Sequence, residues 1–545
     1  MNYIRLALYG LLFLIGITLF NLWQSAHPSA TPAPAQASLM APDERRPDVA
    51  VVSQATPFAA PLTASMPSQR LIKVDTDVLH AEIDLKGGSL VEVTLPAYPE
   101  SLKQPHTPYQ LLSNNPNSLY IAQSGIRSLT PPFEPVLYQA TQAQYQLSPQ
   151  SGDLKVVLQG ENKQGIQFIK TYTFVRGSYL VSVAISAVNH SGHAWQGEGY
   201  LQLLRKKTEE GGGITHAFHF NPFLGAAYST KTNPYQKVNF KKMASSNLDV
   251  SSQEGWVAML EHYFLSAWVP PAGEKLHFYT QAEDSLYSIG MLTTPREIQP
   301  GQTLNQQAKL YVGPLITRDL QGIAPHLDLT VDYGWLWIIS EALFWLLTKI
   351  HAFVGNWGWS IVLVTVLIKA CFYKLSESSY RSMAAMRSIQ PKLQALRERY
   401  GDEKQKLSQA MMEIYRKEKI NPLGGCLPML VQIPVFLALY WVLFASVELR
   451  QAPFIFWIKD LSMPDPYYVL PVLMGLSMFI QQRLSPPPAD PTQAKVMMLM
   501  PLILTLFFLN FPAGLVLYWV VNNSLSILQQ SYIMHRFSKQ PIKRK

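Results

Sequence analysis

The sequence has very little cysteine: its 545 residues include only Cys371 and Cys426. Both lie in or beside apolar segments of the C-terminal half, and residues 24–330 contain none. A disulfide framework is therefore excluded in that long polar region. The two thiols do not have the spacing of zinc ligands, so we interpret them as small buried side chains.

Motifs of catalysis are also missing. The sequence has no H-E-x-x-H, no phosphate-binding G-x-x-x-x-G-K-[ST] loop and no G-x-S-x-G turn. The stretch EEGGGITHAFHF at 209–220 has a glycine run and two histidines, but we interpret it as a loop. Because no nucleophile is paired with a base, we predict that the protein is not an enzyme and uses no metal or other cofactor.

Long apolar runs are present, and they are unevenly placed. Hydrophobic residues make up 48% of the chain and concentrate at 6–23 and after residue 335. This distribution indicates a membrane protein with one large soluble insertion. The net charge of +9 lies largely in segment 374–419, which has eleven Lys/Arg and six Asp/Glu, and in the tail after residue 535. This placement favours a membrane surface over DNA.

The N-terminal half divides into three parts by composition. Residues 1–23 are predicted to be an N-terminal membrane anchor; the small residues of AHPSA (26–30) leave a cleaved signal peptide open, but the apolar run is near spanning length. Residues 24–68, rich in Ala, Pro and Ser, are predicted to be a disordered periplasmic linker. Residues 69–330 alternate apolar and polar side chains between turn residues, which predicts a large periplasmic all-β sandwich domain.

Residues 331–352 are apolar enough to consider as a membrane span, but Glu341 and Lys349 interrupt them and three tryptophans crowd them. If this segment crossed the membrane, the basic residues 374–419 would lie outside, against the positive-inside rule. We therefore predict an interfacial amphipathic helix.

Residues 353–535 are predicted to form the membrane core of a polytopic α-helical protein. With the anchor they give six spans, five of them in the core, and both chain ends in the cytoplasm. Residues 378–419 have helical spacing around the turn YGDEK and are predicted to form a cytoplasmic helical hairpin; residues 536–545 form a basic cytoplasmic tail. The predicted core spans are 354–373, 427–447, 467–483, 496–510 and 515–533.

Polar residues inside these spans are informative, because lipid cannot satisfy them. Lys369 and Thr365 are four residues apart and share a face in the inner half of their span. Lys369 has two interpretations: its stem reaches the inner interface by snorkelling, or its ammonium points into a polar cavity. Other spans place polar residues at similar depth, and these are Gln432, Ser477, Gln481, Asn522, Ser526 and Gln529. Since the outer halves are nearly free of polar residues, we predict a wet cavity open only to the cytoplasm.

Two C-terminal stretches resemble the YidC/Oxa/Alb membrane protein insertase family of Gram-negative type. They are EKINPLGGCLPMLVQIPVFLALYWVLFASVELRQAPF (418–454) and FPAGLVLYWVVNNSLSILQQ (511–530). LPAYPESL (95–102), in the β region, is similar to the periplasmic domain of the same family. The resemblance implies five core helices around a hydrophilic groove, and a periplasmic β-supersandwich like those of sugar mutarotases but without their catalysis.

The resemblance also implies roles for individual residues. Lys369 stands where the family has a groove arginine, so the charge is kept and the planar fork is not. The family's substrate-contacting positions fall on Thr365 and on Trp519, which follows Tyr518 and stands where relatives have tyrosine.

Insertion of membrane proteins, alone or with the Sec translocon, is the function that the resemblance implies. The expected partners are newly made membrane proteins, the Sec translocon, ribosomes and anionic lipids, and the expected location is the bacterial inner membrane. A small-solute transporter with an accessory periplasmic domain is the alternative; it predicts outer-leaflet polar residues or an inverted repeat, and the sequence has neither. An anchored periplasmic carbohydrate enzyme is weaker still, because no catalytic pair can be named.

Overall fold

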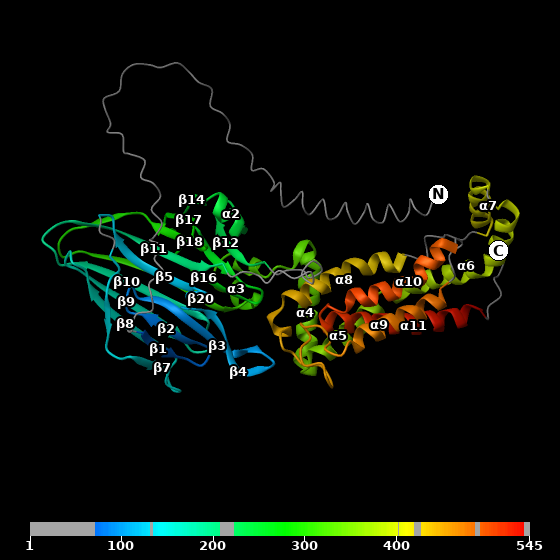
Figure 1. Ribbon diagram of the computed structural model, residues 1–545, viewed down its shortest axis with the longest axis horizontal. Helices are drawn as coiled ribbons and strands as arrows, with labels where there is room; N and C mark the ends of the chain where they lie inside the picture. Colours follow the sequence, from blue (N-terminus) through cyan, green and yellow to red (C-terminus); the bar gives the residue numbers. More distant parts are fainter. Residues whose placement is uncertain are drawn as a thin grey trace, which may run out of the picture.

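The computed structural model describes residues 71–130, 134–207, 223–401, 403–418, 427–485 and 491–538. The predicted anchor at 1–23, the linker at 24–68 and the last seven residues of the tail, 539–545, lie outside these ranges. The described chain forms a large β-sandwich beside a set of helices (Figure 1). The predictions of an all-β domain followed by a helical C-terminal region are confirmed.

The sandwich consists of two sheets. The first has eleven strands in the order β14-β17-β18-β11-β5-β3-β2-β1-β7, with β19 paired to β11 and β4 to β3. Its strands are β1 (Leu71–Asp75), β2 (His80–Asp84), β3 (Ser89–Ser101), β4 (Gln104–Leu112), β5 (Tyr120–Ser128), β7 (Gln144–Gln146), β11 (Trp195–Lys206), β14 (Asp249–Ser252), β17 (Leu276–Glu283), β18 (Leu286–Thr293) and β19 (Arg296–Ile298).

The second sheet has nine strands in the order β13-β12-β15-β16-β20-β10-β9-β8-β6. They are β6 (Tyr138–Ala140), β8 (Asp153–Glu161), β9 (Ile166–Val175), β10 (Leu180–Asn189), β12 (Gly225–Thr230), β13 (Gln236–Asn239), β15 (Gly255–Leu260), β16 (Phe264–Val269) and β20 (Thr303–Pro314). A short helix, α2 (Phe240–Ser245), follows β13.

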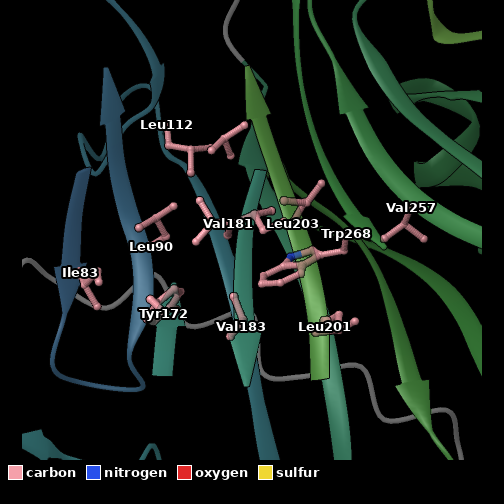
Figure 2. Close-up of a cluster of buried hydrophobic side chains, with 14 of the residues drawn as sticks. Ile83, Leu90, Leu112, Tyr172, Val181, Val183, Leu201, Leu203, Val257 and Trp268 are labelled. Atoms are coloured by element: carbon pink, nitrogen blue, oxygen red, sulfur yellow. The ribbon is translucent and has the colours of Figure 1, made fainter. Parts of the chain in front are cut away.

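Alternation in the sequence explains how these strands bury one face. In β9, every second residue from Ile166 to Phe174 is buried, and its antiparallel neighbour β10 repeats the pattern. The inward residues of both sheets form one apolar cluster between the layers. Figure 2 shows labelled members of it, which are Ile83, Leu90, Leu112, Tyr172, Val181, Val183, Leu201, Leu203, Val257 and Trp268.

One charged side chain lies within this core. The alternation of β9 directs Lys170 inward, where it is fully buried and donates hydrogen bonds of 2.7 Å to the carbonyl oxygens of Gly88 and Ser124. The Tyr172 hydroxyl donates to the same Gly88 carbonyl, and Gly88 has the positive φ that suits glycine in the turn before β3. Burial lowers the pKa of Lys170 to about 7.

The helices follow the sandwich. They are α3 (Thr317–Gln321), η2 (Leu327–Thr330), η3 (Gly334–Leu336), α4 (Trp337–Val354), α5 (Trp357–Cys371), α6 (Tyr373–Tyr400), α7 (Lys404–Lys417), α8 (Leu427–Ala445), η5 (Val447–Leu449), α9 (Val469–Leu484), α10 (Pro491–Phe508) and α11 (Ala513–Ser538).

Helices α5, α9 and α11 run in the same direction. The segment before α9 lies beside the start of α11, because the Gly514 amide donates to the Leu461 carbonyl at 2.9 Å. Ile361, near the start of α5, also lies beside Gly514. Asn356 caps α5 by accepting a hydrogen bond from the Trp359 amide. The C-terminal ends of the three helices therefore lie at one end of the helical region.

The helix that begins the predicted hairpin follows α5 almost directly. Helix α6 begins at Tyr373, and its axis is bent by 66° from that of α5. Helices α6 and α7 pack against each other on either side of Gly401, as a hairpin requires. Their cytoplasmic location stays a prediction.

By length and apolar composition, one helical segment in the described ranges could cross a membrane, and it is Gly334–Val354. The bent pair α5 and α6 would be a second if both helices formed one span. The stretches Val431–Ala445, Val469–Leu484 and Ala494–Phe508 are apolar but shorter. The span count, the domain boundaries and the interfacial position of 331–352 therefore stay predictions.

The sandwich packs directly on the outer end of α8. A second apolar cluster continues from β15 and β16 through η2 into α4, α8 and α11. His262, after β15, lies 2.8 Å from the carbonyl oxygen of Phe444 in the last turn of α8. Burial lowers the pKa of His262 to about 4, so the neutral imidazole donates to a carbonyl that the ending helix leaves unpaired.

Replacing Lys170 with methionine should change how stability depends on pH. The folded pKa of Lys170 is lowered to about 7, so between pH 7 and 10 the unfolded chain holds a proton that the folded chain has lost. The parent's free energy of unfolding should therefore rise over this interval relative to Lys170→Met, by at most about 1.4 kcal/mol per pH unit. Unfolding of the detergent-solubilised chain at pH 6, 7.5 and 9 measures this. Lys155→Met, on the exposed side of β8, is the control; parallel curves for the parent and Lys170→Met would contradict the prediction.

Candidate functional site

Lys369 and Ser526 form the centre of the candidate site. Lys369 lies in the last turn of α5 and is only 3% exposed. Its Nζ donates a hydrogen bond of 2.7 Å to Oγ of Ser526 on α11. Ser526 in turn donates to the carbonyl oxygen of Asn522, one turn earlier. The ammonium therefore points toward α11 and not along its own helix to the interface.

A second polar contact joins α9 to α11 nearby. The Asn523 amide donates to Oγ of Ser477 at 3.0 Å, and Ser477 donates to the Met474 carbonyl of its own helix. Asn523 is three residues before Ser526, about 4.5 Å along the helix axis. The two contacts therefore lie at similar depth on α11.

Glutamines extend this polar region toward the C-terminal ends of α9 and α11. The Oε1 atoms of Gln482 and Gln529, and both amide atoms of Gln530, are buried and have no hydrogen-bond partner among the described residues. The bond between Ser477 and Asn523 sets the register of the two parallel helices, so Gln482 and Gln529 lie at nearly the same level. Buried amides of this kind need water or a polar partner.

The ammonium has no acidic partner. No Asp or Glu of the described ranges forms an ion pair with Lys369, whose ammonium is bound by the neutral Ser526 hydroxyl. A buried cation without a counter-ion is costly, so such residues in membrane helices mark functional sites. The same ranges contain no group of three His, Cys, Asp or Glu residues that could hold a metal ion.

Aromatic residues pack on the outer side of the polar cluster. Trp519 is half-buried, with its ring centre 4.6 Å from that of Phe436 on α8 and 5.1 Å from that of Phe508 on α10. Tyr518 is buried and stacks on the same Phe436 ring. These rings make the region above Lys369 apolar.

The structure does not join all the predicted site residues. Thr365 is buried on the face expected, but its hydroxyl donates to the Ile361 carbonyl of its own helix. Gln432 and Gln481 are half-buried, and no described contact links either side chain to Lys369. Asn522 contributes its carbonyl oxygen to the cluster, through Ser526.

Sequence reasoning missed one contributor, the beginning of α6. Ser376, Ser379 and Tyr380 near the start of α6 are buried, and α6 packs on α11. Burial raises the pKa of the Tyr380 hydroxyl, and the neighbouring Ser526 hydroxyl partly offsets this rise. Their spacing of three and four residues is the signal that could have revealed a buried helical face directly after the span.

Two family models match this chain. Residues 71–346 match the family model described as YidC periplasmic domain, and residues 349–540 match the one described as 60Kd inner membrane protein. The chain belongs to the YidC family. It is accordingly an inner-membrane protein with a periplasmic domain.

Relatives match over nearly the whole chain. A Legionella pneumophila (strain Corby) protein named Membrane protein insertase YidC is 49% identical, covering 98% of this chain and 97% of the relative. A Coxiella burnetii (strain Dugway 5J108-111) protein of the same name is 46% identical, with coverage of 99% and 98%. A crystal structure described as an active YidC insertase with its first transmembrane domain resolved covers 85% of this chain and 92% of its own, at 17% identity and a TM-score of 0.38.

Replacing Asn523 with leucine should weaken the contact between α9 and α11. The change removes the hydrogen bond to Ser477, which keeps its bond to Met474, so we expect a loss of about 0.5–1 kcal/mol and a lower melting temperature. Thermal unfolding in detergent measures it. The matched control is Ser524→Ala, because Ser524 is exposed and bonds only the Val520 carbonyl of its own helix. Equal melting of Asn523→Leu and the parent would show that the bond contributes nothing.

Proposed function

We propose that this protein is a membrane protein insertase and chaperone of the bacterial inner membrane. The observation that carries the proposal is the Lys369 cluster: a cation and buried amides gathered at one end of three parallel helices, with aromatic and aliphatic side chains beyond them. The names of the relatives support the same activity.

The cluster can bind a polar segment of a substrate part-way across the bilayer, because it offers hydrogen-bonding groups there. In this proposal the cluster lines a hydrophilic groove open to the cytoplasm, formed by Lys369, Thr365, Gln432, Ser477, Gln481, Tyr518, Trp519, Asn522, Ser526 and Gln529. The buried glutamine oxygens are the strongest support, because hydrated or substrate-filled surroundings would give them partners. A polar segment that enters the groove needs to cross only the outer half of the barrier.

Lys369 attracts acidic residues of the entering chain. A carboxylate forms a charge-assisted hydrogen bond with an ammonium, which is stronger than the ammonium-to-hydroxyl bond that Ser526 offers. The attraction increases as the surroundings become less polar.

Burial of the substrate's apolar segment in lipid drives release, at about 25 cal/mol per Å² of apolar surface. No nucleotide or metal is required by this scheme. The apolar stretches of α9 and α10, residues 469–484 and 494–508, are shorter than a usual span. Mismatch of this kind thins the bilayer locally and lowers the barrier further.

The proposed orientation places both chain ends and the hairpin of α6 and α7 in the cytoplasm. Newly made membrane proteins are the proposed substrates, received directly or with the Sec translocon. The basic hairpin and tail would contact anionic lipids and ribosomes.

A solute transporter is less well supported, because the polar contacts within α5, α9 and α11 gather at one end and do not line a path through the helices.

Changing Lys369 should affect substrates according to their charge. We expect Lys369→Arg to insert all substrates and Lys369→Ala to impair those with acidic translocated segments, because only alanine removes the cation. Insertion of matched substrates with and without Asp or Glu, measured by protease protection, tests this. Lys374→Ala is the control, since Lys374 is an exposed lysine five residues further on. Normal insertion of every substrate by Lys369→Ala would remove Lys369 from the proposed site.

Neutralising the tail should distinguish ribosome docking from topology. If the tail binds ribosomal RNA, replacing Lys539, Lys543, Arg544 and Lys545 with glutamine should weaken co-sedimentation with ribosomes and flatten its salt dependence. If these charges only keep the tail in the cytoplasm, Arg536 and the basic hairpin are enough to do so. Co-sedimentation with ribosomes should then not change. An unchanged salt slope in the quadruple variant would rule out tail docking.

A further inference from the structure

Helix α6 covers the end of α5 at which Lys369 lies. The chain bends by 66° at Phe372, so the first turns of α6 do not continue α5 away from the cluster. The buried residues Ser376, Ser379 and Tyr380 are three and four positions apart and form one helical face, and α6 packs on α11. The beginning of the hairpin therefore lies against the helix that carries Ser526.

Ser526 is the point at which these parts meet. Its hydroxyl accepts from Nζ of Lys369 and donates to the Asn522 carbonyl. It also neighbours the Tyr380 hydroxyl closely enough to influence the ionisation of that group. Tyr380 is itself buried, and Lys369 is almost without solvent contact. The cation is thus bound to a neutral hydroxyl group of α11, the helix on which α6 packs.

We propose that Tyr380 and Ser526 are positioning residues that hold Lys369 closed until a substrate carboxylate replaces the serine. We call Lys369, Ser526 and Tyr380 the hydroxyl latch. This inference rests on the proposed function, because it assigns how the same site is kept closed and what opens it. It also gives the start of the hairpin a role separate from any contact with ribosomes or lipid.

The relative strength of hydrogen bonds explains why the latch opens to acidic segments. A bond between an ammonium and a hydroxyl carries one charge, whereas an ammonium and a carboxylate carry two opposite charges. The carboxylate therefore displaces Ser526 as the partner of Lys369. Ser526 keeps its bond to the Asn522 carbonyl when it is displaced, so opening leaves no buried hydroxyl proton unpaired.

The test measures how readily Lys369 reacts with an amine reagent. The full-length protein in nanodiscs of phosphatidylethanolamine and phosphatidylglycerol is acetylated with an N-hydroxysuccinimide ester of acetate, and the rate at Lys369 is determined by mass spectrometry. Lys374, which is exposed, gives the internal reference rate. We expect Ser526→Ala and Tyr380→Phe to raise the relative rate at Lys369 by roughly threefold to tenfold, as loss of one modest hydrogen bond predicts.

Two variants provide matched controls. Ser526→Thr keeps the hydroxyl, and Tyr415→Phe removes a tyrosine hydroxyl from α7 without touching the latch, so both should react at the parent rate. Unchanged rates in both Ser526→Ala and Tyr380→Phe would overturn the latch. An equal rise in Tyr415→Phe would also overturn it, because the effect would then be a general loosening of the hairpin.

Insertion assays on the same variants separate this inference from the proposed function. If the labelling rates respond as expected but Lys369→Ala inserts acidic substrates normally, the latch holds and the proposed substrate site fails. If Lys369→Ala impairs acidic substrates while labelling stays unchanged in Ser526→Ala and Tyr380→Phe, the proposed function holds and the latch is wrong.

Discussion

Hydrocarbon offers no hydrogen-bond partner, and this constraint organises the membrane half of the protein. Every polar side chain placed there must find its partner on another helix, on its own backbone or in water. Lys369 and Ser526 satisfy each other between α5 and α11, and Asn523 and Ser477 do so between α11 and α9. Because α5, α9 and α11 run in the same direction, these two contacts lie toward the same end of the three helices.

Sequence could predict which helices carry buried polar residues but not the partners of those residues. Helical spacing correctly placed Thr365 and Lys369 on one buried face, yet only Lys369 reaches a neighbouring helix, because the shorter threonine bonds the Ile361 carbonyl instead. Asn522 was among the predicted site residues, whereas Asn523, which was not, makes the contact with α9. A periodic pattern identifies a face, and only packing decides which helix that face meets.

In the sandwich, too, the sequence pattern predicts the type of element but not how the elements pack. Alternation predicted an all-β domain, and in β9 the same alternation accounts for a lysine among core residues. Strand order depends on contacts between distant segments, which no local pattern records. The apolar cluster that joins β15 and β16 to α4, α8 and α11 crosses the predicted boundary at residue 330. A change of period therefore marks where the element type changes, not where packing ends.

A lysine at position 369, where the resemblance implies arginine, fits this cluster physically. Among the described residues, Ser526 is the single hydrogen-bond partner of the Lys369 ammonium. A guanidinium presents five donors in a fixed plane, so one hydroxyl would leave most of them unpaired in a buried site. An ammonium is compact, and its remaining donors can turn toward a carboxylate that arrives from any direction. Recognition by this chain would therefore depend on the charge of the substrate segment and little on its geometry, which suits a protein that must accept many sequences.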